Sequence, residues 1–221
     1  MKSSTRTVWT VLVLVLALAG SARGSVITFR LVEEFSGGTP PEATVPPPWL
    51  TVTLDDGAND TDGIVTLTLA ATNLTDTEFV SAWYLNLDPL LGPASLLFSS
   101  PTKTGTFDAP TISTGVNAFK ADGDGKYDIL FAFATTNKAG GSHRFGVGDS
   151  IRYTVTGIAS LTAASFDFLS APDGGHGPYH TAAHVQSIGS GEDSGWITAP
   201  EPASVALLAL GGLALVLRRR R

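Results

Sequence analysis

The acidic segment at residues 122–128 is the part of the chain whose residue types and spacing most clearly suggest chemistry. It reads Asp-Gly-Asp-Gly-Lys-Tyr-Asp, which puts carboxylates at relative positions 1, 3 and 7 with glycines between them. Calcium prefers about six to eight oxygen ligands, and glycines let a loop wrap tightly around the ion. Asp122, Asp124 and Asp128 are therefore candidate calcium ligands, and calcium is the only cofactor that the sequence suggests.

The same segment departs from the EF-hand calcium loop in three places. Lys126, Tyr127 and Phe133 occupy the positions where that loop has an oxygen ligand, a glycine and a glutamate. The alternative is an acidic hairpin turn that leads into a strand over residues 127–134. The acidic loop at residues 55–63 is open to the same two interpretations.

Three histidines, His176, His180 and His184, recur at a spacing of four residues. On a helix this spacing would place the imidazoles on one face, as in a zinc site. Glycine and proline at positions 175, 177 and 178 interrupt any such helix. We therefore expect a loop with incidental histidines.

Signals for catalysis are absent from the sequence. The chain has no cysteine, no Gly-x-Ser-x-Gly nucleophile elbow and no phosphate-binding glycine loop ahead of a helix. Trp49, Trp83, Tyr84 and Trp196 could form a platform for stacking sugars, although core packing is the better explanation for Trp83. The sequence thus predicts a protein that is not an enzyme.

Charge is distributed unevenly along the chain. Residues 25–199 hold 19 acidic and seven basic residues, a net charge of −12, whereas the remaining basic residues lie at the two ends. An acidic body repels phosphate backbones, which excludes nucleic acid as an expected partner.

Alternation of apolar and polar residues dominates the middle of the chain. Segments with this period of two include residues 50–54, 65–69, 129–133 and 151–155, and the pattern indicates strands with one buried face. Less regular strand candidates are residues 26–32, 79–87, 96–98, 166–169 and 183–188. No segment of the middle has a convincing helical period, so we expect an all-β fold, an antiparallel β-sandwich of immunoglobulin-like or jelly-roll topology.

The N-terminus has the three parts of a cleaved export signal. Lys2 and Arg6 are followed by an apolar run at residues 8–19 and then by small residues. This run of twelve residues, interrupted only by Thr10, is shorter than the roughly 20 apolar residues that span a bilayer. We therefore expect a signal peptide at residues 1–24, cut between residues 22 and 25.

The C-terminus combines a proline-bracketed acid, an apolar run and a cluster of arginines. Pro200, Glu201 and Pro202 precede the uncharged segment 203–217, and the chain ends with Arg218, Arg219, Arg220 and Arg221. The apolar segment predicts a short transmembrane helix in the inner membrane, with the arginines on the cytoplasmic side. The prolines predict an extended segment at the membrane face.

This ordered tail resembles the PEP-CTERM sorting signal of Gram-negative bacteria. The resemblance covers residues 200–221 and implies recognition of Pro200, Glu201 and Pro202 by an exosortase, a membrane-embedded enzyme similar to cysteine transpeptidases. It also implies export of the body to the cell surface or into the extracellular matrix, where exopolysaccharide is a candidate partner.

The sequence therefore predicts four segments: a signal peptide (1–24), a β-sandwich domain (25–188), a flexible tether (189–199) and the sorting signal (200–221). The expected function is that of an exported, non-enzymatic surface or matrix protein, anchored first in the inner membrane as a precursor. The alternative is a module that binds calcium or carbohydrate within exopolysaccharide.

Overall fold

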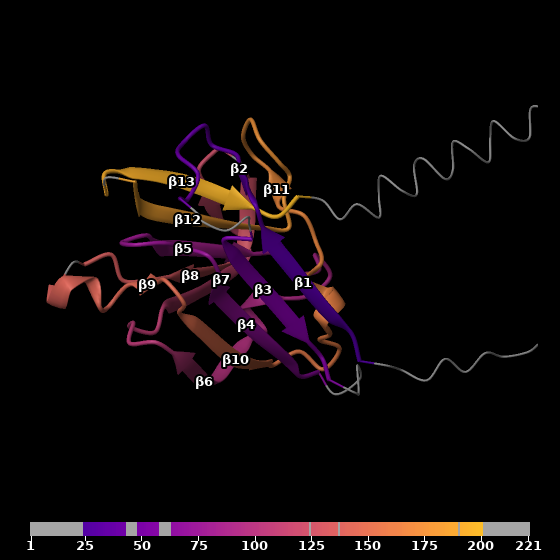
Figure 1. The fold of residues 1–221 in the computed structure, drawn as a ribbon. Helices are drawn as coiled ribbons and strands as arrows, with labels where there is room; N and C mark the ends of the chain where they lie inside the picture. The colour runs from indigo at the N-terminus through magenta and orange to yellow at the C-terminus, as the bar shows by residue number, and fades with distance from the viewer. Residues whose placement is uncertain are drawn as a thin grey trace, which may run out of the picture.

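Two antiparallel sheets form the body of the protein in the computed structural model, which describes residues 24–42, 48–57, 63–123, 125–136, 138–189 and 191–200 (Figure 1). The first sheet has five strands in the order β1-β3-β4-β10-β6. Their bounds are β1 Val26–Leu31, β3 Leu50–Asp55, β4 Val65–Ala71, β10 Ser150–Thr156 and β6 Leu97–Thr104.

The second sheet has eight strands, six of them in the order β11-β8-β5-β12-β13-β2, with β7 beside β8 and β9 beside β5. Their bounds are β11 Ala171–Pro172, β8 Gly125–Ala132, β5 Phe79–Leu85, β12 Thr181–Ile188, β13 Asp193–Thr198, β2 Glu33–Glu34, β7 Thr111–Ala121 and β9 Phe145–Gly146. Three short 3₁₀ turns cover Pro93–Ser95, Lys138–Gly141 and Ala163–Phe166. The prediction of an all-β, antiparallel fold is confirmed.

Strict alternation accounts for three strands of the five-stranded sheet, β3, β4 and β10. In β3 the side chains of Leu50, Val52 and Leu54 are fully buried, while Thr51 and Thr53 between them lie on the outer face. Successive side chains of a strand point to opposite faces, so one face of the sheet is apolar and the other is rich in threonine. The strands predicted at residues 50–54, 65–69 and 151–155 are present, and the one predicted at residues 129–133 is present as far as Ala132, the end of β8.

The apolar faces of both sheets contribute to one hydrophobic core. Phe131 of β8 meets Phe98 of β6 edge to face at 5.5 Å between ring centroids and Tyr153 of β10 at 6.1 Å. Trp83 of β5 is fully buried in the same core, which confirms the expectation for that residue. Burial of these large rings between the sheets holds the two layers together.

One predicted strand is not a strand. Phe166 ends the 3₁₀ turn Ala163–Phe166 and is fully buried, and residues 167–169 form an irregular loop after it. The apolar residues that suggested a strand thus serve to anchor this turn in the core. Conversely, the eleven-residue strand β7 was not predicted; most of its side chains are exposed or half-buried, so it lacks an alternating pattern.

The predicted flexible tether at residues 189–199 is wrong for residues 193–199. Residues 193–198 form β13, which pairs with β12 on one side and with β2 on the other. Ile197 and Ala199 belong to the core, at 0 % and 4 % exposure. The folded body therefore continues to Ala199 and leaves only Pro200 exposed at the end of the described chain.

The signal peptide predicted at residues 1–24 and the transmembrane helix predicted at residues 203–217 lie outside the described residues, apart from Gly24. Within the part of the chain that is described, no helix is long and apolar enough to cross a bilayer.

Candidate functional site

The acidic segment 122–128 forms the tip of the β7–β8 hairpin and the start of β8. Asp122 is exposed at the turn, with a φ of 39° in the left-handed region that aspartate tolerates better than most residues. Asp124 lies outside the described residues. Asp128 belongs to β8 and is only 9 % exposed, so it differs from Asp122 in its surroundings.

Both carboxylate oxygens of Asp128 accept hydrogen bonds from backbone N–H groups. Oδ2 accepts from Leu87 at 3.0 Å, and Oδ1 accepts from Asn117 at 2.8 Å. Asn117 lies in β7 where the pairing with β8 shifts register between Thr114 and Phe119. Asp128 therefore fastens the irregular part of β7 and the end of β5 to β8.

The calcium hypothesis stays a prediction. Among the described residues, which do not include Asp124, no group of three or more histidine, aspartate or glutamate side chains is arranged to hold a metal ion. The second acidic loop is described only at its two ends. There Asp55 Oδ1 accepts from Gly57 N at 2.8 Å, and Asp56 is buried at 4 % exposure.

The three regularly spaced histidines do not converge. His176 lies in the loop before β12, 6.0 Å from the ring of Phe35. His180 stacks on Phe29 of β1 at 5.2 Å and places Nδ1 at 3.1 Å from Asp167. His184 lies within β12, where its ring stacks on Trp196 at 4.6 Å. Each histidine thus makes its own local contact, and only the first two lie in a loop.

The four residues considered as a sugar platform separate into two sets. Trp49 and Trp83 lie in the core, whereas Tyr84 and Trp196 meet on the outer face of the eight-stranded sheet, at 5.6 Å between ring centroids. Tyr84 is only 7 % exposed and Trp196 is partly exposed. They belong to a second cluster, the outer aromatic cluster, whose members include Phe35, Tyr84, Tyr127, Tyr179 and Trp196.

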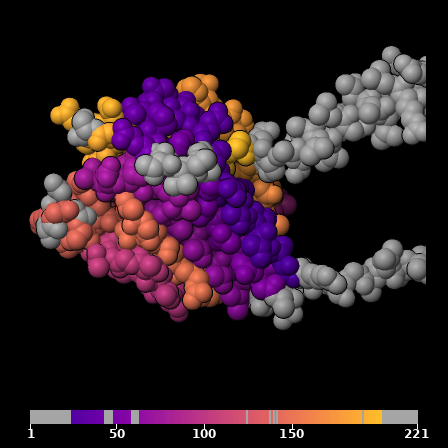
Figure 2. All heavy atoms as spheres, in the orientation of Figure 1, coloured from indigo at the N-terminus to yellow at the C-terminus, as the bar shows by residue number. Residues whose placement is uncertain are grey.

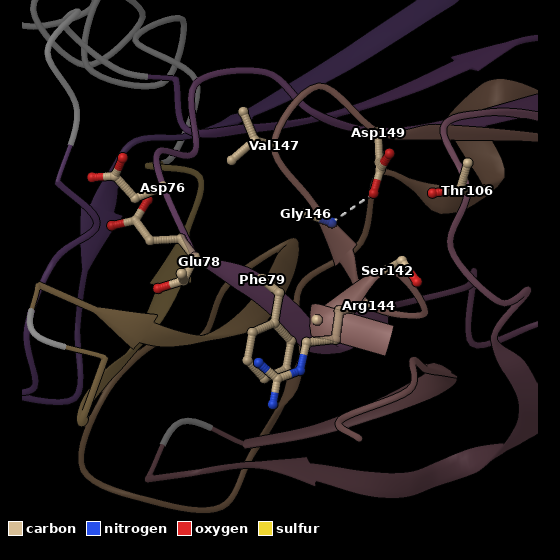
Figure 3. Close-up of a pocket in the computed structure, with 11 residues that line it drawn as sticks. Asp76, Glu78, Phe79, Thr106, Ser142, Arg144, Gly146, Val147 and Asp149 are labelled. Carbon is tan, nitrogen blue, oxygen red and sulfur yellow. Dashed lines mark hydrogen bonds between the residues drawn. The ribbon is translucent and has the colours of Figure 1, made fainter. Parts of the chain in front are cut away.

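A cavity of about 270 Å³ lies beside the start of β5 and brings together groups that the sequence did not single out (Figure 3). Glu78 and Asp149 line it from opposite sides, and the guanidinium of Arg144 lies 4.0 Å from the centroid of the Phe79 ring. Burial raises the pKa of both the Glu78 and the Asp149 carboxyl groups, against hydrogen bonds that lower it.

The charged groups of this cavity are already engaged with the backbone. Glu78 accepts hydrogen bonds from Glu42 N at 2.6 Å and Thr75 N at 2.8 Å, and Asp149 accepts from Gly146 N at 2.8 Å. Arg144 donates to the carbonyl of Thr135 at 3.1 and 2.8 Å. A raised carboxyl pKa in a cavity is one mark of an acid–base site, but these contacts give the carboxylates a role in holding loops. Nothing in the local sequence marks Glu78 as buried.

Hydrogen bonds to three other segments hold the end of β13. The carbonyl of Thr198 accepts from Val32 N at 2.9 Å, and its hydroxyl donates to the carbonyl of Thr181 at 2.8 Å. Trp196 N donates to Glu34 Oε1 at 3.2 Å. Pro200 follows directly, so the body leads into the predicted sorting signal without a spacer; Glu201, Pro202 and Arg218 to Arg221 lie outside the described residues.

These features define an all-β body joined directly to a C-terminal processing segment. The PEP-CTERM protein-sorting motif matches residues 198–221, which confirms the resemblance noted in the sequence. The chain thus carries the signal of an exported protein that an exosortase sorts. Neither the curated proteins nor the solved structures gave a match to this chain.

Proposed function

We propose that this chain is a non-enzymatic protein of the cell surface or extracellular matrix, delivered there through its PEP-CTERM motif. The observation that carries the proposal is the match of that motif to residues 198–221, which begins at the last residue of β13, the final strand of a folded body. The chemistry-bearing groups of the body support it, because Asp128, Glu78 and Asp149 accept hydrogen bonds from the backbone of neighbouring segments.

The proposal includes a route to the surface. The leader at residues 1–24 brings the chain across the inner membrane, and the apolar segment 203–217 holds the precursor there with its terminal arginines in the cytoplasm. Exosortase then acts at Pro200, Glu201 and Pro202. The released body is a β-sandwich, and repeated passage of the chain between the sheets, at β4–β5, β5–β6 and β6–β7, favours the jelly-roll topology.

Intact-mass measurement of the protein from its native host tests this route. We expect a mass that lacks the leader and everything beyond about residue 202, with the protein in the surface or matrix fraction. A substitution of Glu201 by Ala serves as the control and should leave the uncut precursor in the inner membrane. A wild-type protein that keeps its full C-terminus in the cytosol would contradict the proposal.

The alternative function, binding of carbohydrate in the exopolysaccharide, is favoured by one observation. Trp196 and His184 stack at 4.6 Å on the outer face of the eight-stranded sheet, and Trp196 is partly exposed. Aromatic rings are the usual platform for sugar rings. A glycan array with the wild-type body and Trp196→Ala would reveal carbohydrate binding, and calcium titration in the same assay tests the predicted metal site at Asp122, Asp124 and Asp128. Equal retention of the wild-type body and of Trp196→Ala on every glycan would argue against carbohydrate binding at Trp196.

A further inference from the structure

The start of the described body is fastened to a buried carboxylate. Asp56 follows β3 directly and is 4 % exposed. Its Oδ1 accepts from the backbone N–H of Ser25, and its Oδ2 accepts from the Ser25 hydroxyl at 2.9 Å. In return, Asp56 N donates to the carbonyl of Ser25 at 3.2 Å. Ser25 and Asp56 therefore hold one another through three hydrogen bonds.

This carboxylate has neutral partners only. Ala163 N also donates to its Oδ2, at 2.9 Å. The ion pairs between described residues all lie elsewhere in the fold. Burial raises the pKa of Asp56, but the hydrogen bonds from Ala163 and Ser25 outweigh it and keep the pKa below its usual value. Among the described residues, Asp56 is thus an ionised, buried group without a counter-charge, an arrangement that costs stability.

We propose that export cleaves the bond between Gly24 and Ser25, and that the new α-ammonium group of Ser25 is the missing counter-ion of Asp56. The nitrogen that becomes the ammonium already donates to Oδ1, so no chain movement is needed. This inference rests on the proposed export through the leader. Ala22 and Gly24 supply the small residues at the third and first positions before the cut that a leader site requires.

The chemistry is a simple hydrolysis. The bond between the Gly24 carbonyl carbon and the Ser25 nitrogen breaks, and water supplies the hydroxyl of the new Gly24 carboxyl group and the proton of the new amine. At neutral pH the proton of that carboxyl passes to the amine, which leaves a carboxylate on the leader and an ammonium on Ser25. A cut after Ala22 would instead keep the Ser25 nitrogen as a neutral amide.

N-terminal sequencing of the protein exported by its native host is the first test. We expect the mature chain to begin at Ser25. A chain that begins at Arg23, or at any other residue after the leader, would overturn the proposed anchor while leaving export intact. A chain that still begins at Met1 would overturn export and the anchor together.

The pH dependence of stability is the second test and needs no processing assay. An ammonium paired with Asp56 has a pKa above the usual value of about 7.7–8.0. Its stabilising effect is complete below that value and is lost as pH rises through the raised pKa. The melting temperature of the mature wild type should therefore fall as the pH rises above about 8.

Two variants make the test specific. Asp56→Asn should lose this fall in melting temperature, whereas Asp55→Asn, which alters a neighbouring carboxylate bonded to Gly57, should keep it. If Asp56→Asn shows the same fall as the wild type, the ammonium is not paired with Asp56. If Asp56→Asn does not fold, the wild-type profile decides: a melting temperature that stays constant above pH 8 overturns the proposal.

Discussion

Asp128 offers the clearest way to separate a structural carboxylate from a calcium ligand. It accepts the N–H of Leu87, which is 2 % exposed, and the N–H of Asn117, which is exposed. In Asp128→Asn, the single amide oxygen can still accept from Leu87, and water can serve Asn117. Because water replaces the carboxylate at Asn117, the loss is then about 1 kcal/mol, the typical net contribution of one hydrogen bond.

In Asp128→Ala the buried N–H of Leu87 has no acceptor. Leaving such a group unpaired costs about 1–3 kcal/mol, in addition to the bond at Asn117. We therefore expect a total loss of about 3 kcal/mol in the free energy of unfolding. For a domain of this size the melting temperature should fall by about 2–4 °C in Asp128→Asn and by about 6–12 °C in Asp128→Ala.

Calorimetry of residues 25–200 in chelator and in calcium provides the assay. If Asp128 is structural, both losses are the same in the two buffers, and Asp122→Asn at the exposed turn changes little. If Asp128 holds calcium, the ion stabilises the wild type by about 2.7 kcal/mol at a concentration 100 times the Kd, and the Asp128 variants lose that gain. The structural explanation is refuted if Asp128→Ala has the same melting temperature as the wild type in chelator.

Three further predictions concern β13 and its neighbours. Ile197→Ala should lower the free energy of unfolding by about 2–5 kcal/mol in urea titrations, since Ile197 is fully buried. A change near zero would instead favour the original prediction that residues 189–199 form a flexible tether. A flexible spacer of glycine and serine inserted between Ala199 and Pro200 should speed tail removal in a pulse–chase experiment. The reason is that Pro200 to Pro202 span at most about 11 Å between the body and the apolar segment. An unchanged rate would show that the short connection does not limit exosortase. Burial lowers the pKa of His184, so its stabilising effect is present above the unfolded-state pKa and is lost as pH falls through the lower folded-state value. As the pH is lowered below about 6.5, the free energy of unfolding should therefore decrease by up to about 1.4 kcal/mol per pH unit. A His184→Gln variant whose free energy of unfolding has the same pH dependence as the wild type would contradict this.

The sequence predicted the strands that bury one face and expose the other. It missed strands that form mainly because they pair with neighbouring strands. β3, β4 and β10 alternate strictly because one face meets the core and the other meets solvent. β7 carries no such pattern, since its place depends on pairing with β8 rather than on its own apolar residues. β13 was hidden by the Gly- and Ser-rich residues before it, although Trp196 and Ile197 are strand-forming types.

The same limit applies to the candidate sites. The spacing of Asp122, Asp124 and Asp128 is visible in the sequence, but the partner of Asp128 at Leu87 lies 41 residues away and is supplied by the fold. Likewise, the contact between Ser25 and Asp56 joins residues 31 positions apart. Local patterns therefore identified the sorting signal, which acts through its own sequence, more readily than groups that act through tertiary contacts.

The free edge of the five-stranded sheet is interrupted in a way that suits a protein held on a surface. Strand β6 is the last strand of that sheet, and an unpaired edge can template pairing with another copy. Pro101 in its middle has no N–H to donate, Ser100 has a φ of 50°, and the register with β10 shifts between Arg152 and Thr154. Copies anchored by the same tail in one membrane would meet at high local concentration. On the proposed route, an edge that cannot extend a regular ladder would keep such copies from joining into a continuous sheet while the tail anchors them.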